Sequence, residues 1–563
     1  MKASFKLVNM LGYSQVFDDE PKSILDCLSG MGRQRLISVL VGLIPFSNKN
    51  SKFQSPKEFI EMFFEAENNQ IANDIFDRVI EYSENNPDKE VTLVSTESVL
   101  YLLEFAYDNI KDDETLSNQE FEISLFKALL IQNEILFKKQ DVAIRSTDNV
   151  DQKLKLAALS IANTFPNTDI LNYDIIEVLV SQIVKSVSFF EFLELHTNTN
   201  KLLDEFYSQV KVKNWKEYFQ RLLPIIMSSI ISADETHTNV SIPKDDLFEE
   251  NCKFLDKLSI FDSDLLTDFD FRKIRGKPLL KINEGEYKVL YRLFLAEVLH
   301  KGLYFKISEI NRNLSSTDIK EFRGYYCDEF SEKYLFYKQL KYIFKNRYIE
   351  FSGEEIRMRG LIAEPDYYVR NGNKIFLFES KDVLISAQVK SSYDFSLYEK
   401  ELKKRFLRDG NQNKAVLQLV NNVKRILNYE FSFDSRYDAL KVRIYPILVL
   451  HDHQFNVPGL NFIVNEWFQD KVQELGRQGF DITKVQPLII IEMGSLLLHQ
   501  EVFREKRIAL EDVIDQYYIF IGNKKSPLNS LEPFANFVTR LIKDKGKSRI
   551  PKVILDLGLK IFE

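Results

Sequence analysis

The stretch from Ala363 to Asp382 constrains the fold more than any other part of the chain, because it has the pattern of a β-hairpin. Residues 366–370 form one predicted strand, 371–373 the turn and 374–381 the return strand. Asn and Gly supply the positive-φ positions that a tight hairpin needs. The return strand is rich in aromatic and β-branched residues until it becomes polar at Glu379.

The polar ends of the two predicted strands bring three charged residues together. With the turn centred near Gly372, Asp366 lies opposite Phe378 or Glu379. Glu379 and Lys381 are two residues apart on one strand, so their side chains leave the same face. A hairpin that ends in Glu-x-Lys is also common as a solvated strand end, and spacing alone leaves that alternative open.

The chemistry of such a cluster favours a divalent cation. Two carboxylates a few ångströms apart repel each other unless a cation lies between them, and Mg²⁺ prefers oxygen ligands. A metal held by Asp366 and Glu379 can activate water and polarise a phosphodiester. Lys381 can orient that water or stabilise the developing negative charge.

Pro365-Asp366 followed by Glu379-Ser380-Lys381 resembles the signature of the PD-(D/E)xK nuclease superfamily, which includes restriction endonucleases and Holliday-junction resolvases. The resemblance implies a core of helix, three-stranded meander, helix and strand over residues 318–451, extending toward 500. It also implies that Mg²⁺ or Mn²⁺ is bound by Asp366, Glu379 and the Ser380 carbonyl oxygen, with Lys381 as the catalytic lysine.

A long helix is predicted at residues 318–344, before the first strand at 348–354. The superfamily often carries an acidic residue on this helix, which makes Glu332 a candidate third metal ligand. Glu329 is the competing choice, and an exposed helix carboxylate is the alternative for either one. Glu364 is expected at most in an outer position.

Basic residues follow the hairpin on two predicted helices, 399–410 and 411–428. Side chains of this kind contact phosphates and hold a nucleic acid without reading its sequence. A charged helix face is the alternative interpretation. The candidate nucleic-acid-binding residues are Lys403, Lys404, Arg405, Arg408, Lys414 and Gln418.

Two near-continuous apolar runs, 441–451 and 485–493, are typical of central strands covered on both faces. His451 and His453 follow the first run without further Cys or His partners at zinc-site spacing, and we interpret them as a strand-end pair. The C-terminal part, 306–563, is therefore predicted to be a restriction-endonuclease-like α/β domain with a central mixed sheet.

Residues 1–305 are predicted to form a large all-helical region, so the fold class is α + α/β. Residues 233–246 are polar and contain a Pro, which predicts a linker and two subdomains. A strong helical pattern covers 284–300. The acidic run at 262–271 lacks the glycine and spacing of a calcium loop and is interpreted as a solvated helix edge.

Charge is unevenly distributed along the chain. Residues 1–300 carry a net charge of −15 and residues 301–563 a net charge of +7, so the half with the hairpin is the half suited to a polyanion. The three scattered cysteines match no disulfide framework or zinc site, and no apolar run is long enough to span a bilayer. These features predict a cytoplasmic protein with no membrane partner.

Together these features predict a metal-dependent endonuclease, with DNA favoured over RNA as its substrate. By analogy, the protein is expected to be an antiviral defence effector or a restriction enzyme. A protein partner or activator would bind the helical region, and cutting both strands would require a homodimer. Two rivals stay open: a catalytically silent nuclease-like binding or scaffold protein, and a helical interaction module with a coincidental hairpin.

Overall fold

The computed structural model describes residues 7–47, 55–231, 239–261, 263–314, 319–345, 347–434 and 436–562. The chain divides into two compact units. Unit 1 comprises Met1–Val142 and Tyr207–Gly302, and unit 2 comprises Ala143–Phe206 and Leu303–Glu563. A contiguous division at residue 305 is therefore wrong for residues 143–206. The reason is a long-range one: Ala157, Ile161 and Phe165 are buried in the same core cluster as the sheet of unit 2.

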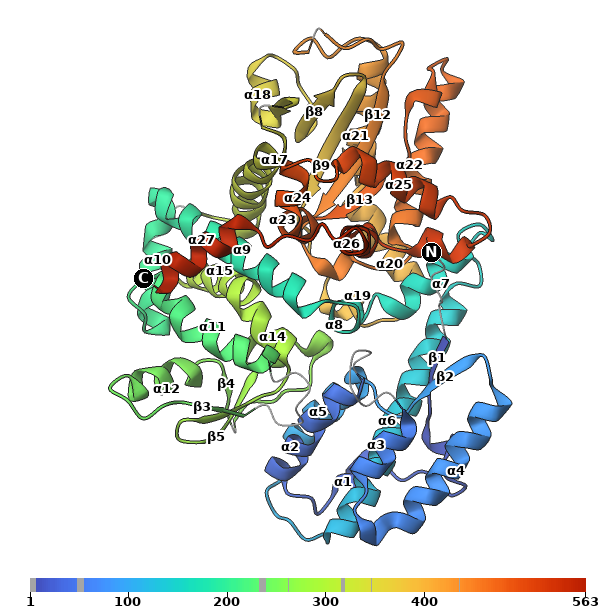
Figure 1. The fold of residues 1–563 in the computed structure, drawn as a ribbon, viewed down its shortest axis with the longest axis vertical. Helices are drawn as coiled ribbons and strands as arrows, with labels where there is room; N and C mark the ends of the chain where they lie inside the picture. Colours follow the sequence, from blue (N-terminus) through green and yellow to red (C-terminus); the bar gives the residue numbers. More distant parts are fainter. Residues whose placement is uncertain are drawn as a thin grey trace. The chain divides into compact units, whose positions relative to one another are not determined.

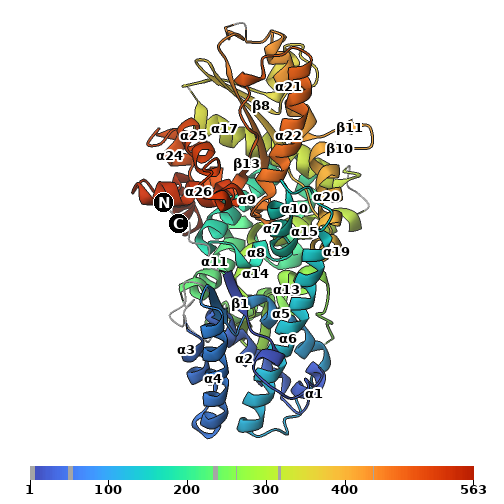
Figure 2. The same ribbon diagram turned by 90° about the vertical axis from the view of Figure 1, so that its right-hand side faces the viewer.

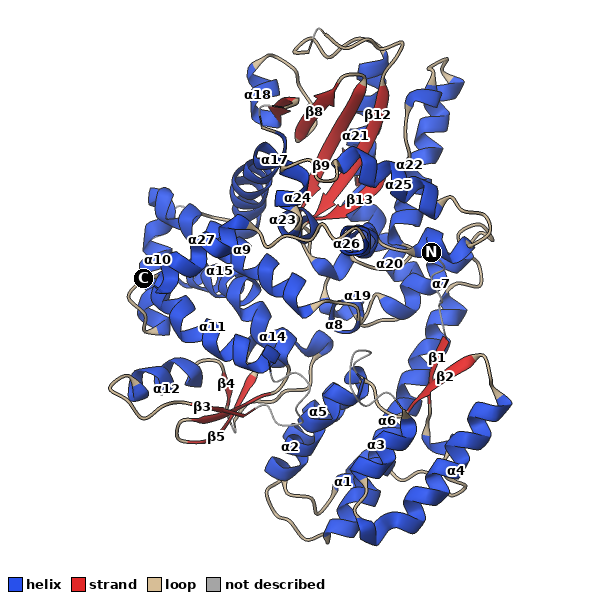
Figure 3. Cartoon of the chain, viewed as in Figure 1, coloured by secondary structure: helices blue, strands red, loops and turns tan. Residues whose placement is uncertain are grey.

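Unit 2 contains a five-stranded mixed sheet in the order β13-β12-β9-β8-β7, drawn as red arrows in Figure 3. The meander β7–β8–β9 is antiparallel, and β9, β12 and β13 are parallel. The protein is thus a mixed α/β protein, and the predicted strands of its C-terminal part are confirmed. Their bounds are Ile349–Ser352 (β7), Tyr367–Asn371 (β8), Lys374–Lys381 (β9), Arg443–Leu450 (β12) and Ile489–Glu492 (β13).

The hairpin forms between β8 and β9. Asn371 pairs with Lys374, so the turn holds only two residues, and Gly372 has the positive φ of 59° that the turn requires. Tyr367 pairs with Phe378. Continuing this register by one residue sets Asp366 beside Glu379, which is one of the two pairings expected from the sequence.

Helices cover both faces of the sheet, as Figures 1 and 2 show. On one face α21 (Ala415–Leu427) packs across β9 and β12, and α22 (Leu460–Arg477) lies against β13. On the other face the rings of Phe336 and Phe344 contact Phe378 of β9. Burial on both sides explains why the central strands are apolar along almost their whole length.

The helix before the sheet runs from Phe322 to Phe344 as α16 (Phe322–Tyr325), a π-helical stretch η6 (Tyr326–Phe336) and α17 (Tyr337–Phe344). It confirms most of the helix predicted at 318–344; residue 318 lies outside the described residues. A π-helical insertion inside an α-helix is uncommon and frequently lies at a functional site.

Unit 1 is mainly helical but not all-helical, and that prediction is wrong. In the described residues of unit 1, two small sheets form from strands of two to five residues, too short to leave a clear pattern in the sequence. One pairs Leu7–Met10 (β1) with Lys89–Thr92 (β2). The other has the order β3-β6-β5-β4, with bounds Asn239–Ser241 (β3), Ser259–Ile260 (β4), Leu279–Asn283 (β5) and Glu286–Val289 (β6).

Two further expectations for unit 1 change with this second sheet. The helix predicted at 284–300 begins instead as a hairpin, because Gly285 adopts φ +78° in the turn before β6; helix follows only from Arg292, in α14 (Arg292–Glu297). Of the predicted linker at 233–246, residues 233–238 lie outside the described residues and Asn239–Ser241 form β3.

The principal helices of unit 1 are the following: α2 (Arg33–Leu43), α4 (Asn69–Asn85), α5 (Thr96–Asn109), α6 (Asn118–Ser146, which ends in unit 2), α11 (Trp215–Ile231) and α12 (Phe248–Asp256). Across the described part of the chain, every helix is too short or too polar to cross a bilayer.

Candidate metal centre

Asp366, Glu379 and Lys381 meet at the end of the hairpin. Lys381 Nζ lies 3.5 Å from Asp366 Oδ2 and 3.4 Å from Glu379 Oε2. The backbone N–H of Ser380 donates to the same Asp366 oxygen at 2.7 Å. One lysine therefore bridges two carboxylates from adjacent strands, as the alternation of β9 leads one to expect.

Glu379 is the most deeply buried member of this cluster. Its side chain is 0 % exposed, and within the described part of the chain its Oε1 atom has no hydrogen-bond partner. Burial, reinforced by the nearby Asp366 carboxylate, raises the pKa of Glu379 well above its usual range. A buried, unsatisfied carboxylate oxygen beside a second carboxylate is a position that a divalent cation can fill.

The carboxylates beside Lys381 keep its side chain protonated. Burial alone lowers the pKa of this ammonium, but the Asp366 and Glu379 carboxylates outweigh it and raise the pKa above that of a free lysine. The side chains of Lys381 and Asp366 remain 21 % and 15 % exposed, so the cluster is accessible from solvent on their side.

Glu332 faces the cluster from η6, where Tyr337 Oη donates to its Oε1 at 2.9 Å. Burial and, to a smaller extent, repulsion from Asp366 raise the pKa of Glu332 to about 7. The competing candidate, Glu329, instead forms an ion pair with Lys333 at 2.6 Å. Glu332 rather than Glu329 is therefore the candidate whose carboxylate interacts electrostatically with Asp366 and Glu379.

Glu364 does not join the carboxylates directly. Its Oε1 accepts a hydrogen bond from Arg357 Nε at 2.8 Å, and this arginine interacts electrostatically with Glu332 and Tyr337. Glu364 therefore holds an exposed arginine near the cluster.

Behind the cluster lies a contact that the sequence did not reveal. Ser380 Oγ is 2.8 Å from His451 Nε2, and both residues are buried. The His451 carbonyl accepts a hydrogen bond of 2.6 Å from Lys185 of α9 (Ile175–Leu195). Burial lowers the pKa of His451 to about 4, so the imidazole is neutral at pH 7. His451 is thus a packing and positioning partner of β9.

The candidate nucleic-acid-binding residues divide into two groups. Lys403 and Arg405 form ion pairs with Glu399 at 2.8 Å and Glu401 at 2.7 Å, each one helical turn earlier. That i, i+4 spacing was visible in the sequence and signals a self-compensated helix face. Lys404 is exposed and precedes the short strand pair that ends the helix.

The remaining candidates surround that strand pair. Arg408 is exposed in β10 (Arg408–Asp409), whereas residues 408–410 were expected to be helical. Lys414 is the residue before α21, not part of the helix, and its Nζ donates to Gln412 at 3.0 Å; Gln418 is half-buried one turn into α21.

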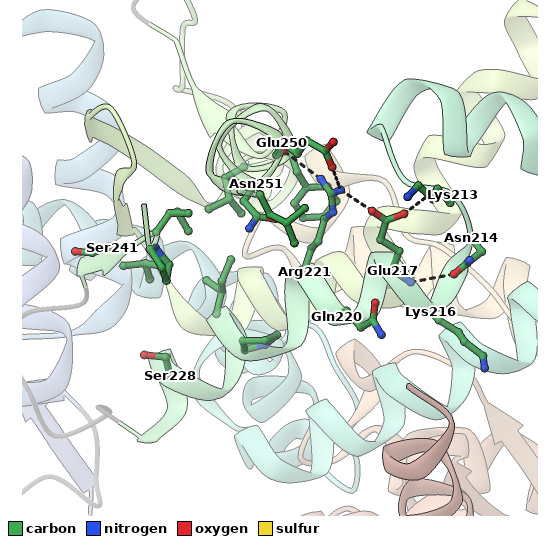
Figure 4. Close-up of a pocket in the computed structure, with 18 of the residues that line it drawn as sticks. Lys213, Asn214, Lys216, Glu217, Gln220, Arg221, Ser228, Ser241, Glu250 and Asn251 are labelled. Carbon is green, nitrogen blue, oxygen red and sulfur yellow. Dashed lines mark hydrogen bonds and ion pairs between the residues drawn. The ribbon is translucent and has the colours of Figure 1, made fainter. Parts of the chain in front are cut away.

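A separate pocket of about 720 Å³ lies in unit 1 between α11, α12 and β3 (Figure 4). Its one largely buried charge, Arg221, is neutralised by Glu217 at 2.5 Å and Glu250 at 2.7 Å. Lys213, Lys216 and several amides lie on its exposed rim. The buried charge of this pocket is therefore paired, whereas in the described residues Glu379 Oε1 at the end of the hairpin has no hydrogen-bond partner.

In comparisons with known proteins, neither a family, nor a curated protein, nor a solved structure matches the chain. The chemistry of the site must therefore be argued from its own residues.

Proposed function

We propose that the protein is a nuclease of the PD-(D/E)xK type that hydrolyses phosphodiester bonds with Mg²⁺ or Mn²⁺. The observation that carries this proposal is the buried Glu379, whose unpaired oxygen lies beside Asp366 and Lys381. Bringing two carboxylates and a lysine together in a buried position is unfavourable for stability, and such clusters of perturbed groups concentrate at active sites.

The carboxylates of Asp366, Glu379 and Glu332 would hold the metal, with the Ser380 carbonyl oxygen as a further ligand. The bound metal would lower the pKa of a coordinated water and neutralise charge on the phosphate. Ser380 N–H fixes one oxygen of Asp366, and Tyr337 fixes one oxygen of Glu332, so both carboxylates are oriented before a metal arrives.

Lys381 would act as a cation rather than as a base. Because its two carboxylate neighbours raise its pKa, Nζ is protonated at neutral pH and has hydrogens to donate. A protonated amine at this position would orient the attacking water or stabilise the negative charge that develops on the phosphate.

The order of elements around the site supports the family assignment. A helix that carries Glu332 is followed by the meander β7–β8–β9, by α21 and by the parallel strand β12. This is the helix, meander, helix and strand order of the superfamily. Fold order does not by itself establish activity, which has to be tested at the site.

DNA is the proposed substrate and antiviral defence or restriction the proposed setting, with unit 1 as the part that receives a partner or activator. The exposed Lys404 and Arg408 would contact the sugar-phosphate backbone. One site per chain cuts one strand, so breaking a duplex would require two copies of the protein.

The decisive experiment incubates wild type, Asp366→Asn and Lys381→Ala with labelled double-stranded DNA, single-stranded DNA and RNA, in Mg²⁺, Mn²⁺ or EDTA. Glu329→Gln is the matched control, because it removes a helix carboxylate that is paired with Lys333. We expect metal-dependent cleavage by wild type and the control only. Cleavage that persists in Asp366→Asn would contradict the proposal. Metal binding without cleavage of any substrate would favour the silent, nucleic-acid-binding alternative.

A further inference from the structure

Asp382, the residue after the lysine of the cluster, receives four hydrogen bonds from one helix. Its Oδ1 accepts from Arg323 Nη2 at 2.6 Å, and its Oδ2 accepts from Ser331 Oγ at 2.6 Å. Its backbone carbonyl accepts from the same Arg323 nitrogen at 2.7 Å and from Cys327 Sγ at 3.3 Å. Both carboxylate oxygens and the carbonyl are thus satisfied.

The three donors form a stripe. Arg323, Cys327 and Ser331 are spaced four residues apart along α16 and η6, where helical geometry keeps them on one face. Asp382 lies on the other side of the chain from Glu379 and Lys381, because side chains alternate along β9 and its continuation. The helix is therefore fastened to the chain behind the cluster.

The contact residues are sequence neighbours of the candidate metal site on both sides. Ser331 precedes Glu332, which interacts electrostatically with Asp366, and Asp382 follows Lys381, which bridges Asp366 and Glu379. The hydrogen bond from Ser331 to Asp382 therefore ties together the two backbone positions from which Glu332 and Lys381 project.

We propose that Asp382 is a positioning residue that sets the separation between the Glu332 carboxylate and the carboxylates of Asp366 and Glu379, so that all three can bind one cation. The proposal rests on the proposed function, because it concerns the geometry of that same metal centre. Asp382 does not touch the metal in this account and acts through Ser331 and Arg323.

Two features make Asp382 suited to this role. Burial alone would raise the pKa of the Asp382 carboxyl, but Arg323 and, to a smaller extent, His451 lower it below the usual range. The carboxylate therefore stays ionised and accepts strong, charge-assisted hydrogen bonds. In addition, the Lys185–His451–Ser380 contacts fix β9 two residues earlier, on the same side of the strand as Asp382. The strand end is thus held at two points and has little freedom to shift.

The test measures Mn²⁺ binding by electron paramagnetic resonance, without any substrate. Wild type is compared with Asp382→Asn and Ser331→Ala. Cys327→Ala is the matched control, because its thiol donates to the Asp382 backbone carbonyl rather than to the carboxylate. We expect the Mn²⁺ dissociation constant to rise about 10–100-fold in Asp382→Asn, as for other outer contacts of metal ligands, and about tenfold in Ser331→Ala, where one hydrogen bond to a charged group is lost.

Ser331→Ala keeps the Arg323–Asp382 ion pair, so the proposal can still be tested with this variant if Asp382→Asn does not fold. A positioning role also predicts that cleavage by Ser331→Ala needs more Mn²⁺ but regains the wild-type rate at saturation, which a purely structural role would not produce. Mn²⁺ affinities equal to wild type in both folded variants would overturn this inference alone. Absence of Mn²⁺ binding by wild type would instead overturn the proposed function.

Discussion

Each unit of the molecule contains a buried glutamate with an unpaired oxygen, and the two differ in their surroundings. Glu104 of α5, in unit 1, is 1 % exposed, and in the described residues neither of its carboxylate oxygens has a hydrogen-bond partner. Glu379 in unit 2 is 0 % exposed and has one such oxygen. Burial therefore does not distinguish them.

The neighbouring charges do. Burial and, to a smaller extent, repulsion from Asp268 raise the pKa of Glu104 to about 9. The nearby Asp108 carboxylate accepts hydrogen bonds from the backbone N–H groups of Leu266 and Thr267. Glu379 has a lysine at 3.4 Å and shares it with Asp366. In the described residues Glu104 forms no ion pair, although Asp268 and Lys273 act on it from nearby, whereas Glu379 shares a paired lysine with Asp366. The comparison teaches that the ion-paired lysine, and not burial or a neighbouring carboxylate, sets Glu379 apart; under the proposed function this arrangement would hold a cation and a phosphate.

The largest effect that this comparison predicts is on catalysis. Lys381→Met removes a charge that would be used in the transition state and should lower the single-turnover cleavage rate about 10²–10³-fold. Because Lys381 is not among the proposed metal ligands, Mn²⁺ binding should be kept. Lys374→Met is the control, since that lysine begins the same strand and pairs with Asp515 at 3.3 Å. A loss of Mn²⁺ binding that matches the loss of rate would refute this division of roles.

The next effect concerns Glu104 and the stability of unit 1. Since its folded pKa of about 9 lies above that of an unfolded glutamate, the folded state binds the extra proton, and this contribution to stability is present below pH 4.5 and is lost as pH rises toward 9. Each unit of pKa difference corresponds to about 1.4 kcal/mol, so Glu104→Gln should stabilise unit 1 by several kcal/mol at pH 8–9 and by less than about 1 kcal/mol at pH 5.

Urea unfolding followed by tryptophan fluorescence can isolate unit 1. The chain has two tryptophans, and Trp467→Phe leaves only Trp215 of unit 1 as the reporter. An equal stabilisation by Glu104→Gln at pH 5 and pH 9 would contradict the assignment of a neutral buried acid.

A third prediction concerns the pH dependence of metal binding. Burial and repulsion from Asp366 raise the pKa of Glu332 to about 7. Below pH 7, therefore, a metal that binds Glu332 must displace the proton of its carboxyl group. Mn²⁺ affinity should rise as pH rises toward 7, by up to about tenfold per pH unit for each proton displaced. Titration calorimetry in buffers of different ionisation enthalpy counts the protons released, and Glu332→Gln should release one fewer. An unchanged proton count would exclude Glu332 as a ligand, and Glu329→Gln serves as the control.

The smallest expected effects are those of the exposed basic residues. Lys404→Ala and Arg408→Ala should weaken DNA binding modestly and each reduce the salt dependence by about one counterion. Lys403→Ala and Arg405→Ala should change it less, because Glu399 and Glu401 already neutralise these side chains. Binding titrations over a range of salt concentrations would show the difference. Equal slopes of log affinity against log salt concentration for all four variants would show that Lys404 and Arg408 do not contact DNA.

Local patterns in the sequence predicted the local parts of this structure. The Asn-Gly turn predicted the hairpin, and the two-residue period of strands placed Glu379 and Lys381 on one face. The continuous apolar runs predicted the buried parallel strands β12 and β13.

The parts that could not be predicted depend on contacts between distant residues. Ser380 meets His451 across 71 positions and Ser331 meets Asp382 across 51, and no local pattern encodes either pairing. The same holds for residues 143–206, whose apolar helix faces do not reveal which core they join. The strands of unit 1 are too short for alternation to be recognised, so the sequence predicts its helices and not its sheets.

The most direct test of the central claim is anomalous diffraction from crystals of the full chain grown or soaked with Mn²⁺. We expect an anomalous peak within about 2.0–2.6 Å of carboxylate oxygens of Asp366 and Glu379, and none at Glu104. A well-occupied peak at Glu104 or elsewhere, with none at the end of the hairpin, would contradict the account.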